Sequence, residues 1–211
     1  MTTTQLEAPV MAVRPLARVG ADTRYVLTGF PVGIAALTLC VTAFSLGLGT
    51  VVLWVGVPIL AATMMFARGF ASAERARIGP VLGQTFEDPT YRTGTGVRRL
   101  LAPLADPQSW RDLAHAILRF IPSTFSFTVV VTWWSMVLGG LTWGLWGWAL
   151  PDGPNDHNLP EWVGLHDSYG LAVAFYLVVA VLFAITLPIV VRGVARLEAG
   201  LAHALLVYRA R

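Results

Sequence analysis

Few residues in this sequence could carry out chemistry, and they form no recognisable catalytic or metal-binding motif. The sequence has one cysteine, Cys40, and four histidines: His115, His157, His166 and His203. No nucleophile stands beside a base, and the glycines of "TGTG" (residues 93–96) lack the strand and helix that flank a phosphate loop. Cys40 lies within an apolar run, so we expect it to pack rather than to react. We therefore expect no enzymatic activity, no cofactor and no metal.

The densest group of reactive side chains lies between Gly140 and Asp167, in "GLTWGLWGWALPDGPNDHNLPEWVGLHD". Histidines beside carboxylates can titrate near neutral pH or bind a metal weakly, and a connection longer than about 12–15 residues is usually functional or disordered. One interpretation is a cap that detects an amphiphile, a cation or pH. The other is an aromatic belt followed by a solvated acidic loop. The candidate residues are Trp143, Trp146, Trp148, Asp152, Asp156, His157, Glu161, Trp162, His166 and Asp167.

A second candidate is a motif that occurs twice. Residues 67–74 read "ARGFASAE" and residues 191–198 read "VRGVARLE", so both contain Arg-Gly-x-Ala-x-x-Glu directly after a long apolar run. We call this the exit motif. The arginine head groups can lie at lipid phosphate level, the small residues permit close helix packing, and each glutamate is too far from its arginine to pair with it on one helix. We expect each glutamate to reach another helix. The motif residues are Arg68, Gly69, Ala71, Glu74, Arg192, Gly193, Ala195 and Glu198.

Three runs without Asp, Glu, Lys or Arg separate these groups: Tyr25–Ala67, Phe120–Pro151 and Ser168–Val191. Charged residues make up 13% of the chain, about half the usual share in a soluble domain. A transmembrane helix needs roughly 20 apolar residues. We therefore expect an all-α integral membrane protein with four spans, at about residues 26–46, 51–66, 121–138 and 170–191. Glycines between the first two spans predict a short turn there.

The basic residues predict the orientation of these spans. All fifteen are arginines: three precede the first span, eight lie between the second and third, and four follow the last. The positive-inside rule then places both termini and the central loop in the cytoplasm, at the plasma membrane. The cytoplasmic parts are a flexible tail (1–23), a loop (84–107) and the C-terminus (207–211). Such a basic face attracts anionic lipid, so we expect the bilayer and not nucleic acid as its partner.

The two halves of the chain resemble each other beyond the exit motif. "FPVGIAALTLCVTAFSLGLG" from Phe30 aligns with "IPSTFSFTVVVTWWSMVLGG" from Ile121. With a shift of one residue, the hydroxyl residues Thr42 and Ser45 correspond to Thr132 and Ser135, which can hydrogen-bond between membrane helices or back to the backbone. We expect two hairpin repeats, residues 24–83 and 108–206, with the same topology and an axis along the membrane normal. The outer loop, residues 140–167, is an insertion in the second.

Residues 108–119 are predicted to form an amphipathic helix that lies in the membrane interface. Asp106 and Pro107 are typical of a helix start, as N-cap and first helical residue. The apolar face would hold Trp110, Leu113, Ala114, Ile117 and Leu118. The opposite, polar face would hold Arg111, Asp112 and Arg119.

Taken in order, several segments resemble the sensor domain of actinobacterial membrane proteins, over about residues 24–206. They are "RYVLTGFPVGIAALTLCVTAFSLGLGT", "ARGFASAERAR", "LADPQSWRDLAHAIL", "VTWWSMVLGG" and "LPIVVRGVARLE". The resemblance implies a four-helix membrane domain that typically precedes the kinase part of two-component histidine kinases and also occurs as a stand-alone protein. In the kinases a phospho-acceptor histidine and an ATP-binding domain follow the last span. Here the sequence stops at Arg211, and neither His115 nor His203 has that context.

Two functions follow as hypotheses. The first is a sensory or regulatory module that detects an envelope or extracellular signal and passes it to a separate membrane or cytoplasmic partner, such as a histidine kinase. The alternative is a non-sensing accessory subunit of a membrane transporter complex. A homo-oligomer also stays open. An independent ion-coupled transporter is disfavoured because the predicted spans contain no ionisable residue.

Overall fold

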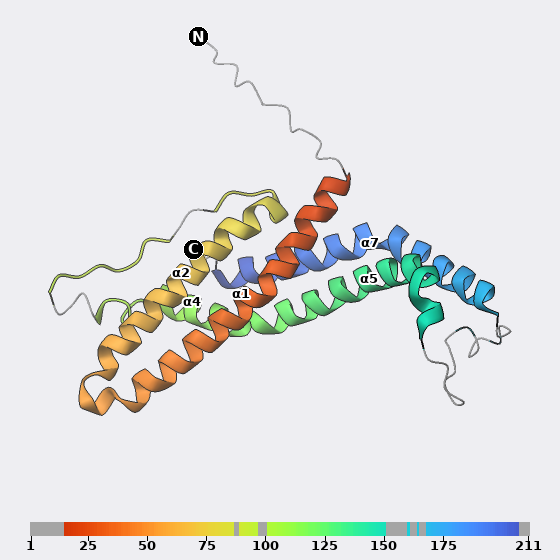
Figure 1. The fold of residues 1–211 in the computed structure, drawn as a ribbon. Coiled ribbons are helices and arrows are strands. Elements are labelled where there is room, and N and C mark those ends of the chain that lie inside the picture. Colours follow the sequence, from red (N-terminus) through yellow and green to blue (C-terminus); the bar gives the residue numbers. More distant parts are fainter. Residues whose placement is uncertain are drawn as a thin grey trace, which may run out of the picture.

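The computed structural model describes residues 15–86, 89–96, 101–150, 160, 164 and 168–206. Its elements are α1 (Pro15–Gly49), the short 3-10 helix η1 (Val51–Leu53), α2 (Gly56–Leu82), α4 (Pro107–Leu118), α5 (Phe120–Trp146), the 3-10 helix η2 (Gly147–Ala149) and α7 (Tyr169–Leu206) (Figure 1). Four helical stretches, α1, α2, α4 with α5, and α7, are long and apolar enough to cross a membrane. The predicted all-α class with four such helices is confirmed.

Helix α1 begins earlier than the predicted first span. Residues 15–23, which we expected to be part of a flexible tail, are helical and continuous with the apolar segment. The buried side chain of Asp22 pairs with Arg192 on α7 at 2.9 Å. This ion pair holds the first turns of α1 against α7. The rest of the predicted tail, residues 1–14, and the C-terminus, residues 207–211, lie outside the described residues.

The turn between α1 and α2 lies further along the chain than predicted. Helix α1 continues to Gly49 and α2 begins at Gly56, five residues after the expected start at Val51. Trp54 adopts a left-handed conformation with φ of 60°. A side chain at Gly56 would overlap the backbone of Gly47 and Val51, so this turn requires glycine at position 56. The tip is apolar and open, with Trp54 84% exposed.

Helix α5 also extends beyond its predicted end at residue 138. It passes through Gly139 and Gly140 without a break and ends at Trp146. Gly140 is buried where α5 meets α7: a Cβ there would lie 2.5 Å from the Tyr176 carbonyl oxygen and 2.8 Å from the Cβ of Ala180. This glycine therefore serves close packing, and residues 140–146 belong to the helix rather than to the outer loop.

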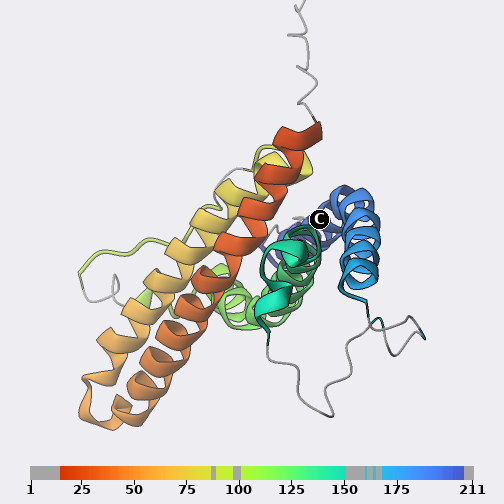
Figure 2. The same ribbon diagram turned by 45° about the vertical axis from the view of Figure 1, so that its right-hand side comes forward.

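The two hairpins, α1–α2 and α5–α7, cross part-way along their length, in the half nearer to the base of each, and their tips point apart (Figures 1 and 2). We use "base" for the end of each hairpin opposite its turn. At the crossing α1 and α5 run in opposite directions: the Trp134 indole donates to the Thr23 hydroxyl at 3.2 Å, and Phe30 stacks on Phe127 at 4.3 Å. The molecule is thus two crossed hairpins rather than one bundle with both tips together.

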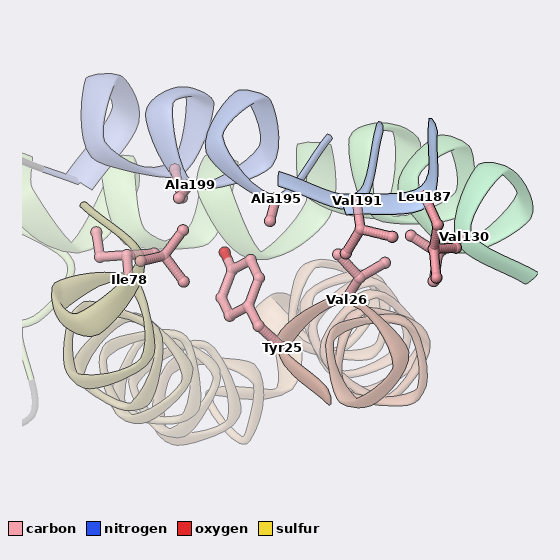
Figure 3. Close-up of a cluster of buried hydrophobic side chains, with 10 residues drawn as sticks. Tyr25, Val26, Ile78, Val130, Leu187, Val191, Ala195 and Ala199 are labelled. Atoms are coloured by element: carbon pink, nitrogen blue, oxygen red, sulfur yellow. The ribbon is translucent and has the colours of Figure 1, made fainter. Parts of the chain in front are cut away.

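Two apolar clusters hold the bases together. The first joins α1, α2, α5 and α7 through small and β-branched side chains, among which Tyr25 reaches from α1 toward Ala195 on α7 (Figure 3). The second joins α1, α2 and α4 and contains Cys40, Met64 and Leu113. Cys40 is 1% exposed, as expected for a packing residue. Helix α4 therefore lies against the first hairpin, which brings its polar residues to the crossing.

Candidate functional site

The crossing of the hairpins encloses a network of buried charges. At its centre is Glu74 of α2, whose side chain is 0% exposed. Glu74 Oε2 lies 2.7 Å from Nη1 of Arg119 and 3.1 Å from Nη1 of Arg77, while Oε1 accepts a hydrogen bond of 2.9 Å from the Tyr25 hydroxyl. Buried charges persist only when they are paired and hydrogen-bonded. Glu74 fulfils that condition with partners from α1, α2 and the α4–α5 junction.

Arg119, between α4 and α5, lies between the two glutamates of the exit motifs. Its Nη1 is 2.7 Å from Glu74, and its Nη2 is 3.8 Å from Oε1 of Glu198 on α7. All three side chains are at most 4% exposed. Both glutamates therefore reach another helix, as their spacing suggested, and both face the same arginine. A single cation links the exit motifs of the two hairpins.

The two sides of Arg119 differ in hydrogen bonding. On the Glu198 side, six buried atoms have no hydrogen-bond partner among the described protein groups: both Glu198 carboxylate oxygens, Arg119 Nε and Nη2, and the hydroxyls of Ser123 and Ser126. Gly29 of α1 closes this side, because a Cβ there would lie 3.0 Å from Glu198 Oε1 and 3.4 Å from Arg119 Nη2. Each unmade buried hydrogen bond costs about 1–3 kcal/mol. The network is thus satisfied toward Glu74 and incomplete toward Glu198.

A second buried ion pair attaches the loop after α2 to the same region. Arg75 and Asp112 pair at 2.8 Å, and the Tyr91 hydroxyl donates to Asp112 Oδ2 at 2.7 Å. The Arg68 guanidinium lies over the Tyr91 ring, 4.2 Å from its centroid. Burial, and then the hydrogen bond to Asp112, raise the pKa of Tyr91 to about 12. The phenol is therefore protonated at neutral pH and fixes the segment of residues 89–96 against α2 and α4.

The two predicted faces of α4 are each divided between the interior and the surface. Of the polar face, Asp112 and Arg119 are buried and Arg111 is exposed; of the apolar face, Leu113 is buried and Trp110 and Leu118 are exposed. The two buried charged groups find partners on α2, and the exposed apolar residues suit the lipid interface. The helix is amphipathic as predicted, with its N-cap at Asp106 accepting a 3.2 Å hydrogen bond from the Gln108 amide.

The arginines of the two exit motifs both bind aspartates from the other half of the chain. Arg68 on α2 pairs with Asp106 at 2.9 Å, just before α4. Arg192 on α7 pairs with Asp22 on α1 at 2.9 Å and donates to the Val81 carbonyl at 3.1 Å. We expected these side chains to reach lipid phosphates, but within this chain they bind protein carboxylates. The Arg68 pair thus joins α2 to the start of α4, and the Arg192 pair joins α7 to the first part of α1.

The small residues of the exit motifs divide between two faces. Ala71 and Ala195 are completely buried, whereas Gly69 and Gly193 are exposed, and a Cβ at either glycine would meet nothing within 4 Å. Two residues along a helix correspond to a rotation of about 200°, so the glycine and the alanine of one motif point in opposite directions. The alanines provide the close contact, and the expected packing role of the glycines is not seen.

Of the two roles predicted for the intramembrane hydroxyl residues, bonding between spans or back to the backbone, their exposure speaks against the first. Their side chains are all exposed on the outer surfaces of α1 and α5: Thr42, Ser45, Thr132 and Ser135. The buried hydroxyls are instead those of Ser109, Ser123 and Ser126, near the crossing.

Only part of the outer candidate site falls within the described residues. The Trp143 ring packs against Tyr176 of α7 at 4.1 Å and against Trp146 at 4.7 Å, so it joins the ends of the second hairpin. Trp148 is 71% exposed. The remaining candidates lie outside the described residues: Asp152, Asp156, His157, Glu161, Trp162, His166 and Asp167. In the part of the chain that is described, no group of three or more His, Cys, Asp or Glu side chains could hold a metal ion.

The buried network includes residues that sequence reasoning did not select. A signal was available: polar residues recur every three or four positions from α4 into α5, at Ser109, Asp112, His115, Arg119, Ser123 and Ser126. This spacing places them on one face of a continuous helix. This series of polar residues was not recognised because its second half lies inside an apolar segment, where single serines hardly change the hydropathy.

The architecture defines the class first: an all-helical protein with four stretches long enough and apolar enough to cross a membrane. A family model described as "Putative sensor" matches residues 25–206, which include both hairpins, both exit motifs and the buried network. The chain belongs to this sensor family. Neither the curated proteins nor the solved structures contain a match to it.

Proposed function

We propose that this protein is a membrane-embedded sensory module without catalytic activity, which passes an envelope or extracellular signal to a separate partner. Membership of the sensor family supports the sensory role. The observation that carries the mechanism is the position of Arg119 between Glu74 and Glu198. Because each glutamate belongs to a different hairpin, a change in the angle between the hairpins changes the contacts of one buried cation.

The proposed orientation has the bases and both termini in the cytoplasm and the two tips outside. The arginine distribution supports it, since neither tip connection contains a basic residue. The exit arginine of each half, Arg68 or Arg192, pairs with an aspartate from the other half. Such an exchange joins the two halves but does not distinguish parallel from antiparallel copies. Because α1 and α5 run in opposite directions where they cross, the proposed orientation requires the two hairpins to turn toward each other in the membrane.

The charge pattern at the bases indicates what they would contact. All five acidic residues in the described part of the chain are buried: Asp22, Glu74, Asp106, Asp112 and Glu198. The exposed charged residues there are arginines: Arg18, Arg24, Arg92, Arg111 and Arg196. This surface suits anionic lipid head groups and an acidic patch on a cytoplasmic or membrane partner.

A crosslinked pull-down of the tagged protein from its native membrane, followed by mass spectrometry, tests the proposal. We expect a histidine kinase or another regulatory protein as the dominant partner. A permease with its ATPase would favour the accessory-subunit alternative, which the exposed apolar faces of α5 and α7 would also suit: Ile121 is 68% and Ile189 75% exposed. Recovery of the chain alone would contradict both.

Shortening of the outer loop tests where the signal enters. A variant without residues 150–166 should retain the partner but lose the response to the stimulus. Retention of every response would remove the loop as the sensing element, and the hairpin tips would become the next region to test.

A further inference from the structure

The buried arginine at the crossing has one bonded and one unbonded carboxylate partner. Its 2.7 Å contact with Glu74 is a full charge-assisted hydrogen-bond distance, and its 3.8 Å separation from Glu198 is too long for one. The unbonded atoms face each other, because Arg119 Nη2 and Glu198 Oε1 form the 3.8 Å pair and both lack a partner. A shift of about 1 Å would bring this pair to the usual N–H···O distance.

Such a shift would leave no glutamate without a bond. Glu74 also accepts a hydrogen bond from Tyr25 and pairs with Arg77, so it keeps two partners when Arg119 moves away. Glu198 has no hydrogen bond to a charged group among the described residues until Arg119 approaches, and its neutral neighbour is the Ser126 hydroxyl. The planar guanidinium presents five N–H donors in a fixed fork, so it can bind a carboxylate on either side. The site therefore has two discrete arrangements, which is what a switching element requires.

We infer that Arg119 exchanges between Glu74 and Glu198, and that each arrangement fixes a different angle between the two hairpins. Glu74 lies on α2 and Glu198 on α7, so the exchange transfers one buried bond from the first hairpin to the second. Only the role of the exchange in transmitting a signal rests on the proposed function. The exchange itself is argued from the described contacts alone.

Gly29 provides a way to lock the exchange. In a Gly29→Ala variant the methyl group would lie 3.0 Å from Glu198 Oε1 and 3.4 Å from Arg119 Nη2, beside the two atoms that must meet, and would crowd the glutamate oxygen. The variant should hold Arg119 on Glu74. Gly33, one turn further along α1, is the matched control. Its Cβ would lie 3.6 Å from the Ser123 hydroxyl, an ordinary contact, and Arg119 and Glu198 are not among the groups it would meet.

Pulsed electron paramagnetic resonance in lipid nanodiscs can measure the angle through the distance between the tips. Spin labels would be attached to the full chain at Val52→Cys and Leu145→Cys, both highly exposed and far from the crossing, with Cys40→Ala to remove the native thiol. We expect Glu74→Gln and Glu198→Gln to give two different distance distributions. Gly29→Ala should match Glu198→Gln, and Gly33→Ala should match the parent protein.

Identical distributions for Glu74→Gln and Glu198→Gln would overturn the inference, and so would an equal effect of Gly33→Ala and Gly29→Ala. If Glu74→Gln does not fold, the parent protein still decides: an exchange predicts two tip-to-tip distances in the parent, of which Gly29→Ala and Glu198→Gln both remove the same one, and a single distance in the parent contradicts it. The labels report on the isolated chain without stimulus or partner. If the tip-to-tip distances change as expected but the pull-down recovers no regulatory partner, the proposed function is refuted and the exchange is not. If a regulatory partner is recovered but the distances do not change, only the exchange is refuted.

Discussion

At the residue scale, Arg119 neutralises carboxylates from two helices within a space that is nearly closed to solvent. Removal of one member of a buried ionic group leaves an uncompensated charge, which typically costs about 3–5 kcal/mol. In Arg119→Met, Glu74 would keep Arg77 and Tyr25, but Glu198 would lose its nearest cation. We expect the free energy of unfolding in mixed micelles to fall by about that amount.

Arg196→Met is the matched control for this measurement. Arg196 is an exposed arginine on α7, two residues from Glu198, and exposed substitutions usually change stability by less than about 0.5 kcal/mol. Equal losses for the two variants would show that the buried network does not stabilise the crossing.

Tyr91 gives a prediction at high pH. Burial and the hydrogen bond to Asp112 raise its pKa to about 12, above the value of about 10 for an unfolded tyrosine. Because the folded state holds the proton more tightly, the contribution of Tyr91 to stability is complete below pH about 10 and is lost as the pH rises toward 12. Tyrosinate absorbance near 295 nm, compared between the parent protein and Tyr91→Phe, should show a difference that titrates close to pH 12. A difference that titrates near pH 10 would mean that the loop does not dock.

The residues of the site were predictable to different degrees. Glu74 and Glu198 could be selected because their motif is repeated, and their spacing from Arg68 and Arg192 already pointed to another helix. Arg119 was predicted on the face opposite Trp110 and Leu118, but the burial of that arginine was not predicted. In water an apolar face must turn toward the protein, but at a membrane surface lipid can cover it. Hydrophobicity alone then does not decide which face of α4 points inward; the charge partners on α2 decide it.

At the scale of the helix, adjacent glycines have different roles. A Cβ at Gly140 would overlap the backbone of α7 at Tyr176, whereas a Cβ at Gly139 would meet nothing within 4 Å. We expect Gly140→Ala to separate α5 from α7 and to cost about 1–3 kcal/mol, as overpacking does. Gly139→Ala should be neutral or stabilise the helix by about 0.5–1 kcal/mol. Thermal unfolding of the two variants in the same detergent distinguishes them, and equal melting temperatures would contradict the close contact.

These glycines also show why the helix boundaries were less predictable than the helices. The apolar runs were sufficient to predict four long helices. The sequence pattern Gly-Gly followed by tryptophans suggested a break after residue 138, but neighbouring helix α7 compensates for the low helix propensity of glycine through close packing. Close packing also explains why the first turn ends at Gly56 and not earlier: the backbones approach too closely there for any side chain. Propensity acts locally, whereas both outcomes depend on a partner helix.

At the scale of the whole molecule, the orientation can be tested by labelling. We expect Trp54→Cys, at the tip of the first hairpin, to react with a membrane-impermeant maleimide on intact cells in a Cys40→Ala background. Gln84→Cys, at the end of α2 beyond the exit motif, should react only after permeabilisation. Both side chains are exposed in the structure, so a difference in labelling reports the side of the membrane. The opposite pattern would invert the topology that the arginines predict.

A tilt of one hairpin about the crossing moves its tip further than it moves the groups at the crossing. From Phe30, at the crossing, helix α1 continues for about 28 Å to Gly49, at a rise of 1.5 Å per residue. Arg119 and its carboxylates lie beside the crossing, so a displacement at a tip becomes a smaller shift there. A stimulus at the outer surface must supply the free-energy difference between the two arrangements by binding one of them more tightly. A ligand that bound both arrangements equally, however tightly, would not operate the molecule.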